Sequence, residues 1–255
     1  MDYKKIATKA ARQGGKILKN NFFDLNNVEG KGEHDIVTQT DIESEKTIIK
    51  IIKKFFPEHT IIAEESGTQS IGSNYVWYID PLDGTSNFIT GNPYFSISIA
   101  LAYKNEIILG VVFNPILNEL YTAEKNKGAF LNNKKLSVSK NKNLSGAILA
   151  SAYSADENDI KQGLKTIETL ALNSRKTVIN FSPALDLCNI ARGRIDGLID
   201  NGTTPEDHAA GSLILLEAGG KIQNFESNNW NVAGKGIIAS NGYLQNFIVD
   251  LIRKK

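Results

Sequence analysis

Residues 77–88 read W-Y-I-D-P-L-D-G-T-S-N-F, and this stretch decides how the rest of the chain is interpreted. Two carboxylates, Asp80 and Asp83, lie three residues apart around a proline, directly after the apolar residues 76–79. The apolar run predicts a short buried strand. Hard cations such as Mg²⁺ take oxygen ligands and are usually held by one or two carboxylates together with substrate phosphate. The stretch therefore predicts a metal site at a strand end, where a backbone carbonyl such as that of Leu82 can join the carboxylates.

The residues after Asp83 predict an anion site beside the metal. Gly84, Thr85 and Ser86 form a turn of the kind that opens a helix. The first N–H groups of a helix have no partner inside it, and they attract anions. A metal site and a phosphate site would thus face the same point in space.

Length and composition are those of an ordinary globular protein. The 255 residues can form one large domain or two smaller ones, and either can bury a substantial core. Hydrophobic residues make up 41% and charged residues 22%, with only 6 prolines, so disorder is not indicated. The 29 basic and 28 acidic residues give a net charge of +1, which argues against nucleic acid or an anionic membrane as the main partner.

Cysteine usage and hydropathy indicate the compartment. The single cysteine, Cys188, excludes an intramolecular disulfide or a multi-cysteine zinc site, as is usual in a reducing compartment. The N-terminus lacks an apolar stretch of signal-peptide length, and no segment approaches the roughly 20 apolar residues of a spanning helix. We expect a cytoplasmic protein without a membrane partner.

The first half of the chain predicts two helices and a series of strands. Residues 3–22 have a helical apolar period, and residues 40–56 form a second helix that Pro57 stops. Thr40 and Glu43 match the capping-box pattern at its start. Strands are expected at residues 61–63, 76–79, 95–103 and 107–114, and around residues 121 and 129, whereas residues 26–35 and 66–74 read as loops.

From about residue 145 the pattern changes to alternating strands and helices, which is typical of α/β proteins. Strands are expected at residues 148–151, 176–180, 195–200 and 236–240, and helices at residues 156–172, 184–192, 207–218 and 244–252. The polar run S-K-N-K-N-L-S separates the two patterns. We therefore predict an N-terminal α+β part over residues 1–143 and a C-terminal α/β part over residues 144–255.

Acidic residues gather at the ends of apolar runs, where they are positioned but still reachable. Besides Asp80 and Asp83 these are Asp41, the pair Glu64-Glu65, and Asp207. At this point the chain resembles the inositol monophosphatase superfamily of Mg²⁺-dependent, lithium-sensitive phosphatases. The matching segments, which follow in order along nearly the whole chain, are D-I-V-T-Q-T-D (35–41), A-E-E-S (63–66), D-P-L-D-G-T-S-N-F (80–88), G-V-V-F-N-P (110–115), G-A-F-L-N (128–132), P-E-D-H-A-A-G (205–211) and E-A-G-G (217–220).

The resemblance implies a fold, an activity and a metal set. The fold would be a layered α-β-α-β-α sandwich of the inositol monophosphatase/fructose-1,6-bisphosphatase type. The activity would be that of a phosphoric monoester hydrolase with two or three Mg²⁺ ions, often as a homodimer. Asp80 would bridge the metals, and the complete ligand set would be Glu64, Asp80, the carbonyl of Leu82, Asp83 and Asp207.

The resemblance also implies roles for the remaining site residues. Asp41 and Thr85 would orient and deprotonate the attacking water, and the backbone N–H groups of Gly84 and Thr85 would bind the phosphate. Asp200 would touch substrate hydroxyls. The loop of residues 180–184 would line the same pocket, so that the substrate contacts would be Asp83, Ser182, Asp200 and Glu206.

Two departures from the family pattern concern the substrate. Family members usually carry Trp directly before the last metal aspartate, and here Glu206 adds negative charge instead. The loop sequence F-S-P-A is bulkier and more rigid than the common small-residue version, because of Phe181 and Pro183. The first departure puts the usual inositol preference in doubt.

Each candidate residue also has a structural interpretation. Asp80 and Asp83 could form a turn, Asp41 could be a carboxylate favoured at a helix start, and Thr85 could cap a helix. Asp200 and Glu206 divide evenly between substrate contact and solvent. For His208 we favour a surface or helical role, and for Asp186 and Asp196 a structural role.

Three hypotheses for function follow. The first is a phosphomonoesterase for a small phosphorylated polyol or sugar, with inositol monophosphate as the leading substrate. In the second, the substrate is fructose 1,6-bisphosphate, NADP, 3′-phosphoadenosine 5′-phosphate or histidinol phosphate. The third, from another class, is a non-catalytic regulatory protein that binds the RNA machinery with the same fold.

Overall fold

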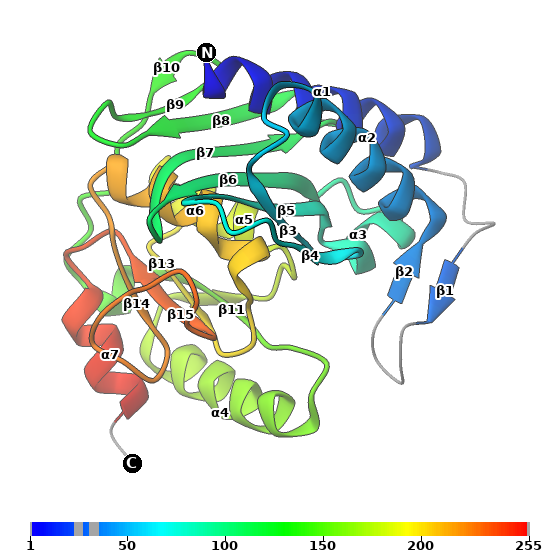
Figure 1. The fold of residues 1–255 in the computed structure, drawn as a ribbon. Helices are drawn as coiled ribbons and strands as arrows, with labels where there is room; N and C mark the ends of the chain where they lie inside the picture. Colours follow the sequence, from blue (N-terminus) through cyan, green and yellow to red (C-terminus); the bar gives the residue numbers. More distant parts are fainter. Residues whose placement is uncertain (1, 23–27, 31–35, 254–255) are drawn as a thin grey trace.

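The structure is a computed structural model, and it describes residues 2–22, 28–30 and 36–253. These residues form two large sheets with helices between and outside them (Figure 1). In the first half the elements are α1 (Tyr3–Asn21), β1 (Val28–Gly30), β2 (Ile36–Thr38), α2 (Gln39–Phe55), β3 (Thr60–Ala63), β4 (Gly67–Gln69), β5 (Tyr75–Asp83), α3 (Thr85–Ile89), β6 (Ser96–Tyr103), β7 (Glu106–Asn114), β8 (Glu119–Glu124), β9 (Ala129–Leu131) and β10 (Lys134–Lys135).

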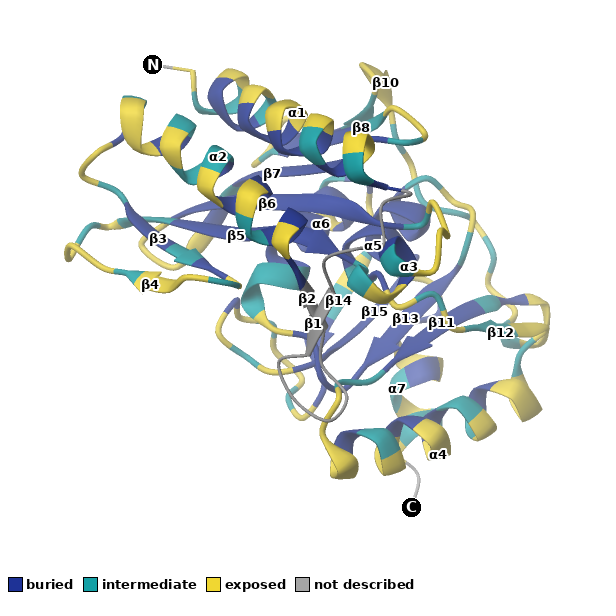
Figure 2. Cartoon of the chain, turned by 90° about the vertical axis from the view of Figure 1, so that its right-hand side faces the viewer, coloured by how far each residue is buried: buried dark blue, intermediate teal, exposed yellow. Residues whose placement is uncertain are grey.

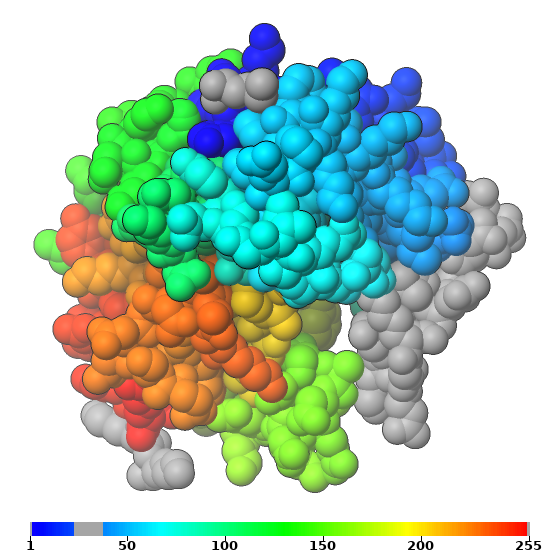
Figure 3. All heavy atoms as spheres, viewed as in Figure 1, coloured from blue at the N-terminus to red at the C-terminus, as the bar shows by residue number. Residues whose placement is uncertain are grey.

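The second half begins with the short 3₁₀ helix η1 (Leu144–Gly146). The remaining elements are β11 (Ile148–Ala152), α4 (Glu157–Asn173), β12 (Lys176–Val178), α5 (Pro183–Ala191), β13 (Gly197–Asp200), α6 (Pro205–Glu217), β14 (Lys221–Asn224), β15 (Ile237–Ser240) and α7 (Gln245–Arg253). Figure 3 shows the same division on the molecular surface, with the first half above the second.

The two sheets differ in size, but each contains neighbouring strands that pair in parallel. The first has eight strands in the order β10-β9-β8-β7-β6-β5-β3-β4, in which only β3 and β5 pair in parallel. The second has five strands in the order β12-β11-β13-β15-β14, and β11 pairs in parallel with both β12 and β13. The carboxyl ends of these parallel strands therefore lie at the same edge of each sheet. Ligands of α/β proteins bind at that edge.

The helices and sheets stack in layers. Helices α1 and α2 cover one face of the first sheet, and their core includes Ile48, Trp77 and Val111. Helices α5 and α6 lie between the sheets, while α4 and α7 cover the outer face of the second sheet, around Leu170 and Ile248 (Figures 1 and 2). The layered α-β-α-β-α sandwich is confirmed.

Helix α6 shows why the middle layer is possible. Its sequence P-E-D-H-A-A-G-S-L-I-L-L-E is apolar or small on all sides after the first turn, and residues 208–215 are all buried. A helix that is apolar all round must be buried on all sides. Close approach also needs Gly110 of β7, since a Cβ there would lie 2.5 Å from the carbonyl oxygen of Ala210.

Most predicted elements are confirmed, with the following corrections. The capping box of α2 consists of Thr38 and Asp41, because the chain turns into the helix two residues before the predicted Thr40. Residues 28–30, expected within a loop, form β1, which pairs with β2; residues 26, 27 and 31–35, including His34 and Asp35, lie outside the described residues.

The strand expected at residues 76–79 continues past Pro81 to Asp83, with an irregular register between Asp80 and Asp83. The sequence also missed β4, β10 and β14, which are short strands at sheet edges. No helix among the described residues is long and apolar enough to cross a membrane. The division at residue 143 stays a prediction; the two sheets lie on either side of it.

Candidate functional site

A cavity of about 460 Å³ lies between the two sheets, next to the carboxyl ends of their parallel strands. Glu64 follows β3, Asp83 ends β5, Ala152 ends β11 and Asp200 ends β13. Six carboxylates line it, and no Lys, Arg or His is among the described residues that do so. The acidic lining consists of Glu64, Asp80, Asp83, Asp156, Asp200 and Asp207.

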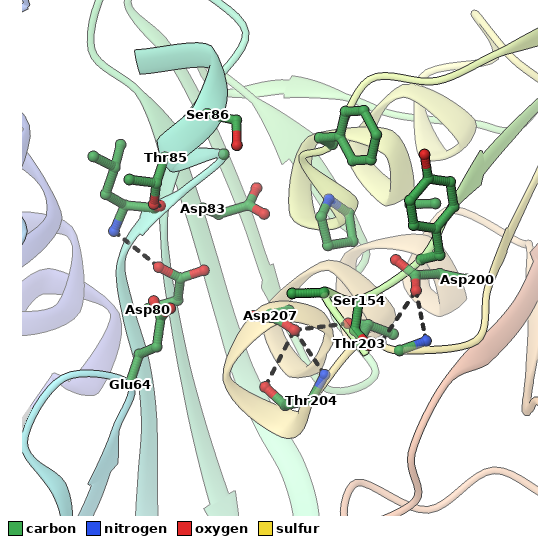
Figure 4. A pocket seen from close by; sticks show the side chains of 18 of the residues that line it. Glu64, Asp80, Asp83, Thr85, Ser86, Ser154, Asp200, Thr203, Thr204 and Asp207 are labelled. Atoms are coloured by element: carbon green, nitrogen blue, oxygen red, sulfur yellow. Dashed lines mark hydrogen bonds between the residues drawn. The ribbon is translucent and has the colours of Figure 1, made fainter. Parts of the chain in front are cut away.

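The cavity has two facing walls (Figure 4). One wall contains Glu64, Asp80, Asp83, Thr85 and Ser86, and the other contains Ser154, Asp200, Thr203, Thr204 and Asp207. The first wall comes from the first half of the chain and the second wall from the second half. A ligand in the cavity would therefore contact both halves.

An irregularity in β5 sets the positions of Asp80 and Asp83. Asp80 pairs with Ser98 of β6 and Asp83 with Ser96, so two residues of β5 oppose one residue of β6. A bulge of this kind changes the direction of the side chains that follow it. Asp80 Oδ1 accepts a hydrogen bond from the backbone N–H of Leu82 at 2.8 Å.

Asp83 is held by two hydroxyl groups from different parts of the chain. Its Oδ2 accepts hydrogen bonds from Ser96 Oγ at 3.0 Å and from Ser182 Oγ at 2.5 Å. Ser182 is fully buried and immediately precedes α5. It does not line the cavity itself, so the structure places it behind Asp83.

Asp207 lies in the first turn of α6, where it completes a capping box with Thr204. Its Oδ2 accepts from the backbone N–H of Thr204 at 2.7 Å and from the hydroxyls of Thr203 and Thr204, both at 3.1 Å (Figure 4). One oxygen is thus fixed by the helix start. No hydrogen bond from the described residues reaches the second oxygen of Asp207.

Burial and mutual repulsion make these carboxylates unusually reluctant to ionise. Burial raises the pKa of Asp80 well above its ordinary value, and the charges of Glu64, Asp83 and Asp207 raise it further. Burial likewise raises the pKa of Asp83 and of Asp207. A buried group of like charges is costly unless a cation compensates it.

The donor set fits hard divalent cations. Carboxylate oxygens are the ligands that Mg²⁺ prefers, and the described residues of the lining supply no cationic side chain to neutralise them. No three His, Cys, Asp or Glu side chains in the described part of the chain already converge as a metal site. One oxygen each of Asp80, Asp83 and Asp207 is turned to a hydrogen-bond donor of the protein. The side chains therefore suit Mg²⁺ by the chemistry of their carboxylate oxygens and not by a preformed coordination geometry.

The predicted anion site begins α3. Gly84 is the N-terminal cap of this helix and has a φ of 96°, which favours glycine. Thr85 Oγ1 donates to the carbonyl oxygen of Leu82 at 3.1 Å. Leu82, Gly84 and Thr85 all line the cavity, as Asp80 and Asp83 do.

Asp200 lines the facing wall, as the resemblance implied for a substrate contact. Its Oδ1 accepts from the backbone N–H groups of Gly202 at 2.9 Å and Thr203 at 3.1 Å. Burial raises the pKa of Asp200 to about 7, and the charge of Asp207 adds to this. Protonated Asp200 could donate a hydrogen bond, and ionised Asp200 could accept one.

Besides Ser182, two predicted site residues do not line the cavity. Asp41 is buried, and its Oδ2 caps α2 by accepting from Thr38 N–H at 2.7 Å and Thr38 Oγ1 at 2.5 Å, while its Oδ1 has no partner among the described residues. Burial raises the pKa of Asp41 to about 6. Glu206 is half-buried, and its backbone carbonyl accepts from Ser98 Oγ at 3.0 Å.

Three titratable residues for which the sequence predicted no role in the site have hydrogen-bond partners inside the protein. His208 is fully buried, so the surface role is wrong, whereas its position in a helix is confirmed by α6. Its Nε2 lies 3.3 Å from the carbonyl oxygen of Val232. Asp186 and Asp196 are buried and hydrogen-bonded, in keeping with structural roles.

The sequence missed several lining residues. Tyr153, Ser154 and Asp156 belong to the turn that follows β11. They directly follow a strand that pairs in parallel, and this position could have predicted that they line a binding site. Thr203 and Thr204 were also missed, although the spacing from Thr204 to Asp207 matches a capping box.

The fold and the site define an α/β protein with an acidic, oxygen-rich cavity between two halves, suited to cations and a phosphorylated ligand. Residues 2–255 match the inositol monophosphatase family. The chain belongs to this family, which confirms the resemblance.

Individual relatives agree over nearly the whole chain. A Nus factor SuhB of Haemophilus influenzae is 41% identical over 92% of this chain and 90% of its own. A fructose-1,6-bisphosphatase/inositol-1-monophosphatase of Aquifex aeolicus is 37% identical over 99% and 96%. The solved structure of an inositol monophosphatase of Thermotoga maritima has a TM-score of 0.91 and 36% identity, covering 100% of this chain and 98% of that one.

Proposed function

We propose that this protein is a Mg²⁺-dependent phosphomonoesterase of the cytoplasm that hydrolyses a small phosphorylated polyol or sugar, with inositol monophosphate as the first substrate to test. One observation carries the proposal: Glu64, Asp80, Asp83 and Asp207 line one cavity that has no cationic side chain among its described lining residues. Membership of the inositol monophosphatase family supports the same activity.

The protein's own groups divide the work of the reaction. Glu64, Asp80, the Leu82 carbonyl, Asp83 and Asp207 would hold two or three Mg²⁺ ions, which would supply an activated water and neutralise the leaving oxygen. The backbone N–H groups of Gly84 and Thr85, at the start of α3, would bind the phosphate. The alcohol part of the substrate would then contact the opposite wall of the cavity, which contains Asp200.

Thr85 and Asp41 have the proposed role of orienting and deprotonating the water. The Thr85 hydroxyl lies in the cavity wall, and its hydrogen bond to the Leu82 carbonyl fixes its direction. Asp41 is buried and does not itself line the cavity, and a carboxyl pKa near 6 suits a general base. Asp83, Ser182 and Glu206 complete the proposed substrate contacts, with Ser182 acting by holding Asp83.

The test is phosphate release from inositol monophosphate, fructose 1,6-bisphosphate, NADP, 3′-phosphoadenosine 5′-phosphate and histidinol phosphate. Each is measured with Mg²⁺, with EDTA and with added Li⁺, which should inhibit. The variant Asp80→Asn should lose Mg²⁺-dependent release by on the order of 100-fold or more. Without Mg²⁺ it should be at least as stable as the wild type, because one buried like charge is removed.

Asp2→Asn is the matched control, since it removes one carboxylate charge far from the cavity. Asp2 is exposed and caps α1 by accepting from the Lys5 N–H at 3.0 Å, which asparagine can also do. The control should keep the wild-type rate. A normal rate in Asp80→Asn would contradict the proposed role of Asp80.

A second function is favoured by the names of several relatives. Besides the Haemophilus influenzae protein, a relative from Escherichia coli at 39% identity is named Nus factor SuhB. A non-catalytic, regulatory protein that binds the RNA machinery would keep the fold but not need metal. Salt-dependent RNA binding together with no phosphate release would favour this function.

We also propose that the protein forms a homodimer. Sedimentation would detect it.

A further inference from the structure

An ion pair lies behind the cavity wall that faces the carboxylates. Lys235 Nζ donates to Asp159 Oδ2 at 2.6 Å, and Ser154 Oγ donates to the same oxygen at 2.5 Å. Ser154 lines the cavity (Figure 4), whereas neither Asp159 nor Lys235 does. The ion pair is thus connected to the cavity through one hydroxyl group.

Asp159 is ionised in the folded protein. Its side chain is buried, and burial raises its pKa. The hydrogen bonds from Lys235 and Ser154, together with the charge of Lys235, lower the pKa by more, so that it lies below the ordinary value for Asp. A carboxylate without a proton can only accept hydrogen bonds. The hydroxyl proton of Ser154 therefore points to Asp159.

Ser154 is consequently presented to the cavity as a hydrogen-bond acceptor. A serine hydroxyl has one proton and two lone pairs. Asp159 holds the proton, and one lone pair accepts from the backbone N–H of Asp156 at 3.2 Å. Within the described chain these are the only two hydrogen bonds of Ser154 Oγ, so one lone pair is left for a donor. A hydroxyl group of an alcohol is such a donor.

The backbone of Asp159 also holds the loop that follows β13. Its carbonyl oxygen accepts from Asn201 Nδ2 at 2.9 Å, and Asn201 directly follows Asp200. The same loop touches the turn that contains Ser154, since a Cβ on Gly202 would lie 2.5 Å from the Ser154 backbone nitrogen. Asp159 therefore contacts both segments that contribute polar groups to this wall.

The backbone next to Lys235 is fixed against that loop. The N–H of Gly236 donates to the carbonyl oxygen of Thr203 at 3.0 Å. Gly236 has a φ of 66°, and a Cβ there would lie 2.9 Å from the Asp200 carbonyl oxygen. The side chain of Lys235 is 61% exposed, so its ammonium group stays partly hydrated. The pair therefore avoids most of the desolvation cost of a fully buried ion pair.

We propose that Asp159 and Lys235 are positioning residues, which orient Ser154 and the loop after β13 so that this wall accepts a hydrogen bond from the alcohol part of the substrate. The proposal rests on the phosphatase function proposed above. Since neither residue lines the cavity, their effect passes through Ser154 and the loop. Removing the pair should weaken binding of the alcohol part and leave the phosphate side of the cavity intact.

The experiment measures kcat and KM for inositol monophosphate with Mg²⁺ in Lys235→Met and Asp159→Asn. KM should rise about three- to tenfold in each variant, as expected for a hydrogen bond that is no longer oriented, while kcat stays within about twofold. The inhibition constant of inorganic phosphate, which lacks the alcohol part, should also stay within about twofold. Lys235→Arg keeps the positive charge and should restore the wild-type KM.

Lys161→Met is the matched control, because it breaks another ion pair of α4, the helix that contains Asp159. Lys161 Nζ lies 2.5 Å from Glu157 Oε1, both side chains are exposed, and neither lines the cavity. The control should keep the wild-type kcat and KM.

Ser154→Ala tests the path from the ion pair to the cavity. In this background Lys235→Met should change KM by less than about twofold, because the hydroxyl that the pair orients is gone. A rise in KM as large as in the wild-type background would overturn the proposal. A KM within about twofold of the wild type in both Lys235→Met and Asp159→Asn would do the same. Equal weakening of inositol monophosphate and inorganic phosphate would show a purely structural role, and would also overturn it.

Hydrogen exchange of the backbone gives a second readout that needs no turnover. The amides of residues 153–156 and 200–204 should exchange faster in Lys235→Met than in the wild type, and at the wild-type rate in Lys161→Met. If no phosphate ester is hydrolysed but these amides exchange faster, the phosphatase function fails and the pair still positions this wall. Normal hydrolysis with unchanged exchange and unchanged KM overturns the positioning role alone.

Discussion

Replacing Asp186 by Asn should change how stability depends on pH, because this carboxyl is fully buried and only one of its oxygens is hydrogen-bonded within the described residues. Its Oδ1 accepts from Tyr94 OH at 2.6 Å and from Asn180 Nδ2 at 2.7 Å. Its Oδ2 is buried without a hydrogen-bond partner in the described chain. Burial therefore raises the pKa of Asp186 to about 6, from 3.8 for an ordinary Asp.

The sign and size of the effect follow from this pKa. Between about pH 4 and pH 6 the folded protein keeps a proton on Asp186 that the unfolded chain releases, so the free energy of unfolding falls as pH rises. The stabilisation from protonated Asp186 is complete below pH 3.8 and is lost as pH rises through about 6. A difference of about 2 in pKa corresponds to about 3 kcal/mol.

Asparagine at position 186 stays neutral and can keep both hydrogen bonds to Oδ1. The free energy of unfolding of Asp186→Asn, relative to the wild type, should therefore rise by up to about 3 kcal/mol between pH 4 and pH 7. Urea denaturation of both proteins across this range measures the difference and cancels the other titrating groups. Asp250→Asn, at an exposed position of α7, should show no such trend. A difference between Asp186→Asn and the wild type that does not vary with pH would refute the reasoning.

Three further changes test the packing and the site. Gly110→Ala should cost about 1–3 kcal/mol in urea denaturation, because its Cβ would lie 2.5 Å from the Ala210 carbonyl oxygen; unchanged stability would contradict the close approach. Thr85→Ala should lower kcat on the order of 100-fold with KM nearly constant, whereas a change in KM alone would assign Thr85 to binding. Arg192→Ala should cost about 2 kcal/mol, since it breaks a half-buried ion pair of 2.7 Å with Glu119; a loss below about 0.5 kcal/mol would show the pair to be unimportant.

The long elements of the fold could be predicted from the sequence, as could the edge strand β12, whereas three other short edge strands could not. Helices α1, α2 and α4 have a clear helical period over 17 or more residues, and the central strands are continuous apolar runs. The edge strands β4, β10 and β14 have two to four residues, many of them polar, so their local sequence resembles that of a loop. Their pairing depends on neighbours that are distant in sequence.

The carboxylates of the site could be predicted because each stands at the end of an apolar run. Glu64, Asp80, Asp83 and Asp207 indeed line one cavity. The place of Asp41 could not be predicted, since only the structure shows that Thr38 rather than Thr40 begins α2. The contact between Tyr153 and Phe181 could not be predicted either, because 27 residues, including the whole of α4, lie between them in the sequence.

The middle helical layer has a consequence for how the chain reaches its folded state. The inner face of the first sheet, with Tyr78, Ala100 and Val112, packs on α5 and α6. That sheet ends at Lys135, whereas α6 ends at Glu217, which is 82 residues later. At about 5–20 residues per second the ribosome needs about 4–16 seconds to make this stretch. Throughout that interval a nascent chain exposes an apolar sheet surface, which makes it a natural client for chaperones.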